Sequence, residues 1–389
     1  MNFEERILRR QRTDGDARLV RDGDAVNPLA HLDEPVGRGP VLERLLDAVA
    51  PVFEGELPAD SYLWGPAGSG KSALVTALVE HLSRLVGGGG RAIYTTTRGG
   101  STGPSLAVRY VDARTANSAF GLHYAVLDAL SDDAIPRGGV RTDALRERLA
   151  EWLSRRNRRV LLVVDHVGEP ETYPASFVTD QFAPLADAVA TVCVGRDPPA
   201  EGEWEPAQVV EVPAYDRHAL EDVLTTRVSR GLSPRALRHE QLARIASWAD
   251  GNAYDALCAL FCAVDAAVTA GADRVSDEHV DAGMAAVPRD GVPLGRVLAL
   301  SDARRTVLRH LVTLDADQRT SVGATAEAIA ADPEVSLSVG TVTRVLYELA
   351  ETGILDRVTV EADSGRGRPP SRLEPRFSTL AFRRLYDAA

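Results

Sequence analysis

In the first half of the chain, short apolar runs alternate with amphipathic stretches. This pattern predicts strands over 61–64, 107–111, 159–165 and 190–194, and helices over 41–50, 72–85 and 120–130. The run Arg-Val-Leu-Leu-Val-Val-Asp at 159–165 is almost wholly apolar, as is typical of a strand buried on both faces of a parallel sheet. Strands that alternate with helices in this way predict an open α/β sheet.

The pattern changes after residue 213. Helical spacing of apolar positions then predicts helices over 217–230, 240–249, 252–270 and 276–286. Beyond the turn-rich stretch 288–293, further helices are expected over 302–311, 324–331 and 339–352, followed by strands over 354–362 and 373–377. Three helices followed by a β-hairpin is the order of a winged helix. We therefore expect four segments: a loosely packed N-terminal arm (1–30), an α/β domain (31–211), a helical domain (212–290) and a winged-helix domain (291–389).

Composition excludes a wholly disordered chain and a membrane span. Of the 389 residues, 44% are hydrophobic and 26% are charged, which is ordinary for globular domains. The stretch that comes nearest to a membrane span, 253–272, is interrupted by Asp255 and Asp265, so no membrane partner is expected. The first residues have no apolar segment of the signal-peptide kind, and three cysteines fit neither a disulfide framework nor a zinc site. Together these features favour a reducing cytoplasm.

The charged residues are unusual in kind and in distribution. Lysine occurs once, at position 71, among 44 basic residues, and the net charge is -12. Acid excess with so little lysine is typical of adaptation to a salty cytoplasm, although GC-rich coding also replaces lysine with arginine. Residues 291–389 carry 13 acidic and 13 basic residues, so the acid excess lies in 1–290. This asymmetry indicates a C-terminal domain with a partner of its own.

The strongest motif for chemistry is a phosphate-binding loop. It follows the strand expected at 61–64, opens the helix expected at 72–85, and fits the pattern G-x-x-x-x-G-K-[ST]. Its glycines let backbone N–H groups surround phosphates, and the helix N-terminus favours negative charge. The lysine would reach the β- and γ-phosphates and the serine would coordinate Mg²⁺, so ATP and Mg²⁺ are the predicted ligands. The loop residues are Gly65, Pro66, Ala67, Gly68, Ser69, Gly70, Lys71 and Ser72.

The end of the buried strand 159–165 carries a second candidate ligand. Asp165 stands where the Walker B aspartate of P-loop NTPases holds Mg²⁺, and the alternative is an aspartate that caps the next turn. His166 follows it, and either accepts a proton or packs in a turn. Glu169 lies three residues beyond His166 and can take over a catalytic role only if the loop folds back.

The C-terminal domain carries a candidate DNA-binding surface. Thr341, Thr343 and Arg344 lie at the start of the helix expected at 339–352, which is the end of a recognition helix that contacts base edges. Between 364 and 384 there are six arginines and one acid. Arginines near a hairpin loop suit phosphates or a minor groove, and those of the loop are Arg366, Arg368 and Arg372. Double-stranded DNA is the predicted partner, and the alternatives are a solvated or a protein-binding loop.

These motifs together resemble the archaeal origin-recognition and cell-division-control type of AAA+ replication initiator. The resemblance extends over 31–49, the phosphate-binding loop, 107–130, 212–227, 301–311 and 353–368. It implies an α/β P-loop NTPase domain of AAA+ type, an α-helical lid domain and a C-terminal winged-helix domain. It also implies ATP, Mg²⁺ and origin DNA as ligands, and a replicative helicase or other initiator subunits as partners. The chain looks like a divergent, haloarchaeal-like member.

Four groups that act on the γ-phosphate in that family are replaced or missing. His166 stands in place of the glutamate after the Walker B aspartate, and Arg196 in place of a polar sensor residue. The segment 201–208 has no arginine where the family has its arginine finger, and Tyr254 replaces the arginine of the lid. The phosphate-binding loop and Asp165 remain. We therefore expect ATP binding with slow hydrolysis, so that nucleotide acts as a structural ligand or a long-lived switch.

Two functions of different classes fit these observations. The first is a replication-initiator-like protein of the nucleoid that binds ATP and DNA, in origin recognition or helicase loading. The second is a nucleotide-switched transcriptional regulator, or a signalling ATPase, whose winged helix contacts promoter DNA or a protein. The domain order favours the first and the missing hydrolytic groups favour the second. An active motor is disfavoured by His166 and Arg196, and an inert paralogue by the retained Lys71 and Ser72.

Overall fold

The structure, a computed structural model, describes residues 19–87, 106–131, 134–155, 158–199, 204–359 and 371–386. The described chain divides into two compact units. One unit combines the N-terminal residues up to Ala30 with Tyr215–Arg289, and the other combines His31–Ala214 with Asp290–Ala389. The transitions expected from the sequence at 31, 212 and 291 lie at or near these divisions.

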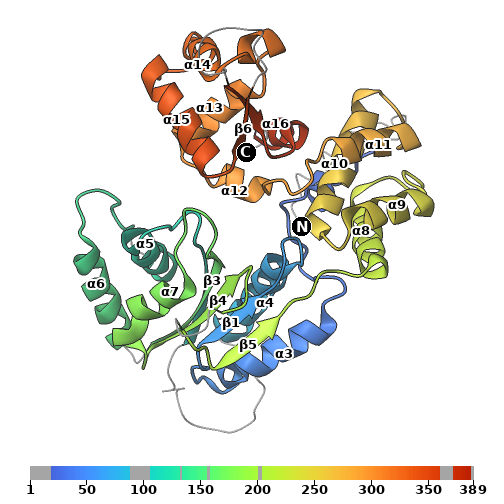
Figure 1. Ribbon diagram of the computed structural model, residues 1–389. Coiled ribbons are helices and arrows are strands. Elements are labelled where there is room, and N and C mark those ends of the chain that lie inside the picture. The colour runs from blue at the N-terminus through green and yellow to red at the C-terminus, as the bar shows by residue number, and fades with distance from the viewer. Residues whose placement is uncertain are drawn as a thin grey trace, which may run out of the picture. The chain divides into compact units, whose positions relative to one another are not determined.

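A five-stranded parallel sheet forms the centre of the α/β domain (Figure 1). Its order is β2-β3-β4-β1-β5. In the register of the sheet, Val194 of β4 pairs with both Leu63 of β1 and Asp165 of β3, so the carboxyl ends of these three strands meet at one edge. Such an edge is where ligands bind in open α/β sheets. The strands are β1 (Ser61–Trp64), β2 (Leu106–Asp112), β3 (Arg159–Val167), β4 (Val189–Gly195) and β5 (Gln208–Glu211).

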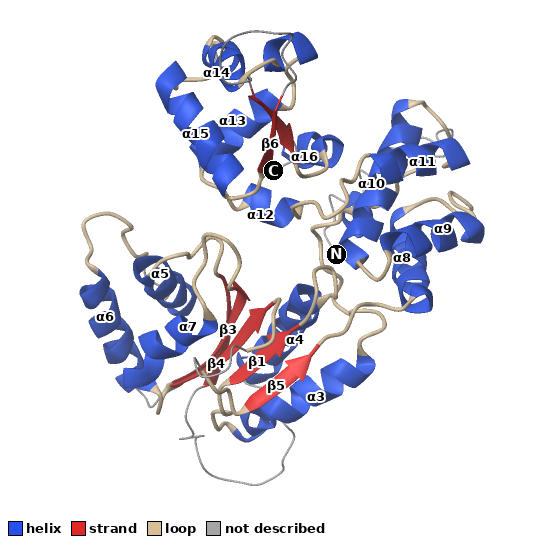
Figure 2. Ribbon diagram, in the orientation of Figure 1, coloured by secondary structure: helices blue, strands red, loops and turns tan. Residues whose placement is uncertain are grey.

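Alternating side chains of β3 are buried on the two faces of this sheet. Leu161 and Val163 belong to the core that contains α3 (Gly39–Val49) and α4 (Lys71–Gly87). Leu162 and Val164 belong to the opposite core, and all four side chains are fully buried. That second core contains α5 (Ala119–Leu130), α6 (Thr142–Ser154) and α7 (Ala175–Phe182), as Figure 2 shows. The prediction of a doubly covered parallel sheet is therefore confirmed.

Two α-helices and one strand of this domain have no counterpart in the sequence-based expectation, namely α6, α7 and β5. Helix α6 fully buries only the leucines at positions 145, 149 and 153, and five of its thirteen residues are charged. Helix α7 has eight residues, and β5 has four with Val210 alone buried. Elements so short or so polar leave a weak periodic signal.

The helical unit contains α8 (Arg217–Gly231), α9 (His239–Ala249), α10 (Ala253–Thr269) and α11 (Asp277–Ala285), at the places expected from the sequence. The expectation of a loosely packed arm is wrong for residues 19–30. Leu19 is 4% exposed and Val26, in the short helix α2 (Gly23–Val26), is 2% exposed. Arg227 of α8 donates hydrogen bonds to the carbonyl oxygens of Ala25 and Ala30, at 3.2 and 2.6 Å. Apolar burial and this buried arginine together fix the segment against α8.

The C-terminal domain has the element order expected for a winged helix. Three helices, α13 (Asp302–Leu311), α14 (Val322–Ala330) and α15 (Val339–Glu351), precede the antiparallel pair β6 (Leu355–Thr359) and β7 (Ser371–Pro375). The short helix α12 (Leu294–Leu298) comes before them and α16 (Thr379–Tyr386) after them. Leu308, Ile329 and Leu346 are fully buried, and the three helices that carry them, α13, α14 and α15, contact one another.

A buried histidine in the α/β domain makes its stability depend on pH. His123 of α5 is fully buried beside Phe182, and Arg146 Nε lies 3.2 Å from its Nε2. Burial and the Arg146 charge lower the pKa of His123 to about 4. An unfolded histidine binds a proton below about pH 6.5, so stability is expected to fall as the pH drops from 6.5 towards 4. Between pH 7 and pH 5 the expected loss is about 2 kcal/mol.

Urea unfolding at pH 7 and pH 5 measures this effect. His123→Leu is expected to lose less stability than the parent over that range. The matched control is His218→Gln, because the His218 side chain is 82% exposed, and it should keep the parent's pH dependence. Identical pH dependence in His123→Leu and the parent would show that His123 is not the group responsible.

Candidate functional site

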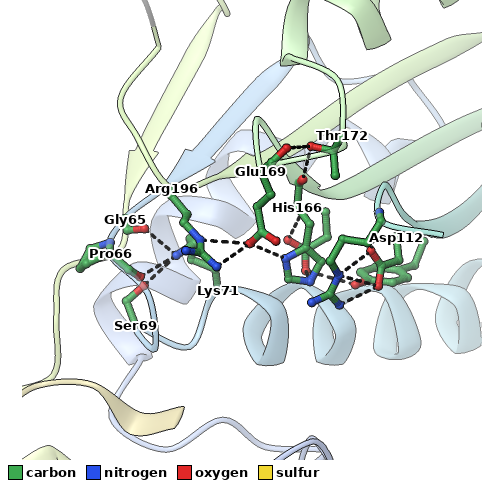
Figure 3. A network of polar contacts seen from close by, with 12 residues as sticks. Gly65, Pro66, Ser69, Lys71, Asp112, His166, Glu169, Thr172 and Arg196 are labelled. Atoms are coloured by element: carbon green, nitrogen blue, oxygen red, sulfur yellow. Dashed lines mark hydrogen bonds and ion pairs between the residues drawn. The ribbon is translucent and has the colours of Figure 1, made fainter. Parts of the chain in front are cut away.

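The phosphate-binding loop joins β1 to α4 and closes around the side chain of Lys71 (Figure 3). Lys71 Nζ donates to the carbonyl oxygens of Gly65 and Pro66, at 2.6 and 2.7 Å, and lies 3.3 Å from Ser69 Oγ. The residue is 9% exposed. These oxygens of the loop thus accept the hydrogen bonds that the ammonium group would donate to phosphate oxygens.

Glycine is required at three positions of this loop. Gly68 and Gly70 have φ angles of 68° and 82°, in the left-handed region that other residues rarely adopt. At Gly65 a Cβ atom would lie 2.1 Å from the carbonyl oxygen of Val212. Val212 itself is fixed by the hydrogen bond from its N–H to the carbonyl oxygen of Trp64, at 2.7 Å. A side chain at position 65 would therefore displace the backbone that follows β5.

The ammonium group of Lys71 is short of compensating charge. Burial lowers the pKa of Lys71 to about 8, even though the negative charges of Asp165 and Glu169 act to raise it. The positive charge of Arg196 lowers it further. A polyphosphate would supply the negative charge that this buried cation lacks. The electrostatics of the loop therefore suit an anionic ligand.

Asp165 is the buried acid of the site, with 1% exposure. Its Oδ1 accepts a hydrogen bond from the His166 backbone N–H at 2.7 Å, and its Oδ2 accepts one from the Tyr110 hydroxyl at 3.1 Å. Burial and the Asp165 charge raise the pKa of Tyr110, which keeps the hydroxyl protonated as a donor. A buried carboxylate near Lys71, with Ser72 in the first turn of α4, is a donor set that suits Mg²⁺.

The chain turns back directly after Asp165. His166 has a φ of 65°, and the pairing of β3 with β4 shifts register between Asp165 and Val167. Thr172 Oγ1 closes the turn by donating to the carbonyl oxygens of His166 and Glu169, at 3.1 and 2.7 Å. Glu169 is 6% exposed, and its Oε1 lies 3.3 Å from His166 Nδ1. The loop therefore folds back, which was the condition for Glu169 to join the site.

Arg196, the residue after β4, completes this network. Its Nε and Nη2 both contact Glu169 Oε1, at 3.0 and 2.9 Å (Figure 3). Burial acts to raise the pKa of Glu169, but the hydrogen bond with His166 and the charge of Arg196 outweigh it and lower the pKa to about 2. Glu169 is thus a buried carboxylate that stays ionised at neutral pH. The sequence alone did not place it among the site residues.

In the C-terminal domain, the three predicted contacts on α15 differ in what they present. Thr343 Oγ1 donates to the carbonyl oxygen of Val339 at 2.8 Å, and Thr341 Oγ1 lies 2.9 Å from Ser338 Oγ at the helix start. Both hydroxyl groups are therefore engaged within the helix. The Arg344 side chain is 70% exposed and pairs with Glu348 at 3.0 Å, so it projects from the helix surface.

Two further residues extend this surface. Tyr347, one turn beyond Arg344, is 38% exposed, and the guanidinium of Arg357 on β6 lies 5.4 Å from the centre of its ring. Arg372 lies on β7 and pairs with Glu374 at 2.6 Å. The sequence analysis did not identify Tyr347 or Arg357, although the three-residue spacing from Arg344 to Tyr347 is the helical signal that could have identified the tyrosine. Two predicted contacts, Arg366 and Arg368, lie outside the described residues.

Comparison with known proteins identifies the central domain. Residues 34–194 match the family described as the AAA ATPase domain. This part of the chain is an AAA ATPase domain. An AAA ATPase domain binds nucleotide, so the phosphate-binding loop and Asp165 lie in a nucleotide-binding domain.

Relatives that match about 70% of the chain bear out the resemblance drawn from the sequence. ORC1-type DNA replication protein 1 of Aeropyrum pernix is 26% identical over 304 residues, 72% of each protein. ORC1-type DNA replication protein 5 of Halobacterium salinarum is 24% identical over 297 residues, which is 69% of this chain and 66% of that protein. The similarity thus includes a haloarchaeal protein.

Solved structures share the fold along almost the whole chain. The structure of the Aeropyrum pernix ORC1 protein in complex with DNA covers 96% of this chain and 98% of that one, with a TM-score of 0.64 and 22% identity. The ORC2 protein of the same organism, in ADPNP–ADP complexes, covers 95% and 98%, with a TM-score of 0.56 and 18% identity. These matches extend from the AAA ATPase domain to the C-terminal domain.

The structure also shows where the residues lie that replace the family's γ-phosphate-contacting groups. His166 and Arg196 are both bound to Glu169, and Tyr254 lies at the start of α10 in the helical unit. Within the described residues, no helix is both long and apolar enough to cross a membrane.

Proposed function

We propose that this chain is an ATP-binding and DNA-binding protein of the replication-initiator kind, which acts in origin recognition or helicase loading and hydrolyses ATP slowly. The observation that carries the proposal is the joining, in one chain, of an AAA ATPase domain with a complete phosphate-binding loop to a C-terminal domain with exposed arginines on α15 and its hairpin. The names of the ORC1-type relatives support it. A replicative helicase or other initiator subunits would be its protein partners, and it would act in the cytoplasm, in association with the nucleoid.

In this proposal each group of the nucleotide site has a separate role. The loop backbone from Gly65 to Gly70 and the ammonium of Lys71 bind the β- and γ-phosphates. Ser72 and Asp165 hold Mg²⁺, which when bound neutralises charge on the phosphate oxygens. The Tyr110 hydroxyl keeps Asp165 oriented through its hydrogen bond.

Hydrolysis would be slow because the γ-phosphate would lack cationic groups that stabilise the transition state. An arginine finger supplies about 10³–10⁵ in rate in NTPases that use one. Arg196 is committed to Glu169, and position 254 of the helical domain is a tyrosine instead of a cation. Bound ATP would then persist long enough to act as a switch for DNA binding.

DNA binding measured by fluorescence anisotropy of a labelled duplex tests this function. The parent should bind duplex DNA, and ATP-Mg²⁺ should change the affinity. Arg344→Ala is expected to weaken DNA binding about tenfold, because the substitution removes an exposed positive charge from the surface of α15. The double variant Arg366→Ala/Arg368→Ala should reduce the slope of log affinity against log salt by about 1 for each phosphate group that the variant no longer binds.

The series should extend to molar potassium chloride, since the chain is acid-rich and depleted in lysine. Arg309→Ala is the matched control, because Arg309 lies on α13 with its guanidinium 5.4 Å from the centre of the Tyr386 ring. It should bind DNA like the parent. Binding that ignores ATP, or no binding at any salt concentration, would count against the initiator function. Preference for promoter over origin DNA would instead favour the nucleotide-switched regulator.

A further inference from the structure

One carboxylate oxygen in the network of Figure 3 accepts no hydrogen bond from the described residues. Glu169 Oε1 takes the contacts from Arg196 Nε, Arg196 Nη2 and His166 Nδ1, at 3.0, 2.9 and 3.3 Å. Glu169 Oε2 is buried and has no hydrogen-bond partner among the described residues. Structural pairs between arginine and a carboxylate frequently engage both oxygens with two N–H groups of the guanidinium. Leaving a buried carboxylate oxygen unpaired is costly, and in native proteins such an oxygen typically has a catalytic role or binds a water molecule or an ion.

The backbone that places this oxygen is strained. His166 adopts a φ of 65°, in the left-handed region that few residues other than glycine adopt. Such conformations cost about 1–3 kcal/mol and gather at functional sites. Gly168, with a φ of 74°, continues the turn, and its N–H donates to the Tyr173 carbonyl oxygen at 2.9 Å. The result is that an acid three residues beyond His166 returns to the edge of the sheet where β1, β3 and β4 end.

We propose that Glu169 positions the attacking water for ATP hydrolysis, in place of the glutamate that is missing at position 166. This inference rests on the proposed function, because it requires ATP at the phosphate-binding loop. Glu169 lies close enough to Lys71 for its charge to act on that ammonium. A water molecule held by Oε2 would therefore lie in the neighbourhood of the ammonium group that would bind the γ-phosphate.

The step needs no further reactant. The water oxygen forms a bond to the γ-phosphorus while the bond from that phosphorus to the β–γ bridging oxygen breaks. The electron pair of the broken bond leaves with ADP, and one proton of the water passes along Glu169 Oε2 to the released phosphate. A carboxylate that stays ionised aligns this water molecule by accepting a hydrogen bond from it. Phosphoryl transfer through a loose transition state depends more on this alignment than on a strong base.

Glu169→Gln tests the proposal, because glutamine keeps the shape and the acceptor for Arg196 but removes the negative charge. Single-turnover hydrolysis of radiolabelled ATP is expected to fall about 100-fold. Affinity for a fluorescent ATP analogue should stay within about 3-fold of the parent, since positioning of a water is not part of ground-state binding. Nucleotide extracted from the incubated variant should be ATP, where the parent yields ADP. Asp180→Asn, which removes an exposed acid of α7 in the same domain, is the matched control and should behave like the parent.

The double variant His166→Glu/Glu169→Gln separates this role from a structural one. It restores a glutamate at the family position and should recover at least about tenfold of the lost turnover, with thermal unfolding used to verify that it is folded. Equal turnover in Glu169→Gln and the parent would overturn the proposal, as would a folded double variant without recovery. A parent whose turnover does not exceed that of Lys71→Ala would overturn it too. If the parent binds no ATP analogue, the proposed function itself fails, and that result is distinct from these.

Discussion

Lys71→Ala is expected to lower the affinity for ATP at least about 100-fold while the chain remains folded. Lys71 is the lone lysine among 44 basic residues, and it lies buried inside the loop with its ammonium on two carbonyl oxygens. A hydrogen bond to a charged group contributes about 1.5–3 kcal/mol, so two phosphate contacts account for a change of this size. Titration calorimetry with ATP-Mg²⁺ gives the affinity.

The matched control for this prediction is Arg84→Ala, near the other end of the same helix. The Arg84 side chain is 59% exposed and forms a surface pair with Glu80, so its removal should leave the affinity unchanged. Thermal unfolding of both variants verifies that α4 persists. Because the pKa of Lys71 is lowered to about 8, the parent's affinity should also decline as the pH rises above 8, and Lys71→Ala should lack that decline. Unchanged affinity in a folded Lys71→Ala would remove the role assigned to this loop.

Gly283→Ala is expected to destabilise the helical unit by about 1–3 kcal/mol or more. A Cβ at this position of α11 would lie 2.5 Å from the carbonyl oxygen of Ala259 and 2.7 Å from the backbone nitrogen of Ala263. Both atoms belong to the backbone of α10, which cannot move aside as a flexible side chain can. The two helices would have to separate.

The same substitution in another helix should have the opposite sign. Gly340 lies in α15, and a Cβ there meets nothing within 4 Å. Gly340→Ala should therefore stabilise by about 0.5–1 kcal/mol, since alanine loses less backbone entropy in a helix. Urea unfolding of both variants beside the parent measures the pair. Changes of equal sign would mean that helix propensity, and not the contact between α10 and α11, decides the effect at Gly283.

Much of the candidate nucleotide site could be predicted from the sequence because its determinants are local. The eight residues from Gly65 to Ser72 fix a turn, a cation and a helix start within one stretch of chain. The apolar run that ends at Asp165 identified its own strand, because burial on both faces leaves no polar positions. The helical unit and the helices of the C-terminal domain followed in the same way from the spacing of their apolar residues.

The tertiary structure alone decided which distant groups meet. It brought Glu169 back to Asp165 through a left-handed residue, and it set Arg196 on one oxygen of that carboxylate while leaving the other without a partner among the described residues. It also packed residues 19–30 against α8. It placed Gly283 against the backbone of α10 and left open space around Gly340. Periodicity reports which side of an element is buried, but not what lies opposite. That depends on the crossovers of the sheet and on turns closed by hydrogen bonds between residues that are not neighbours in the chain.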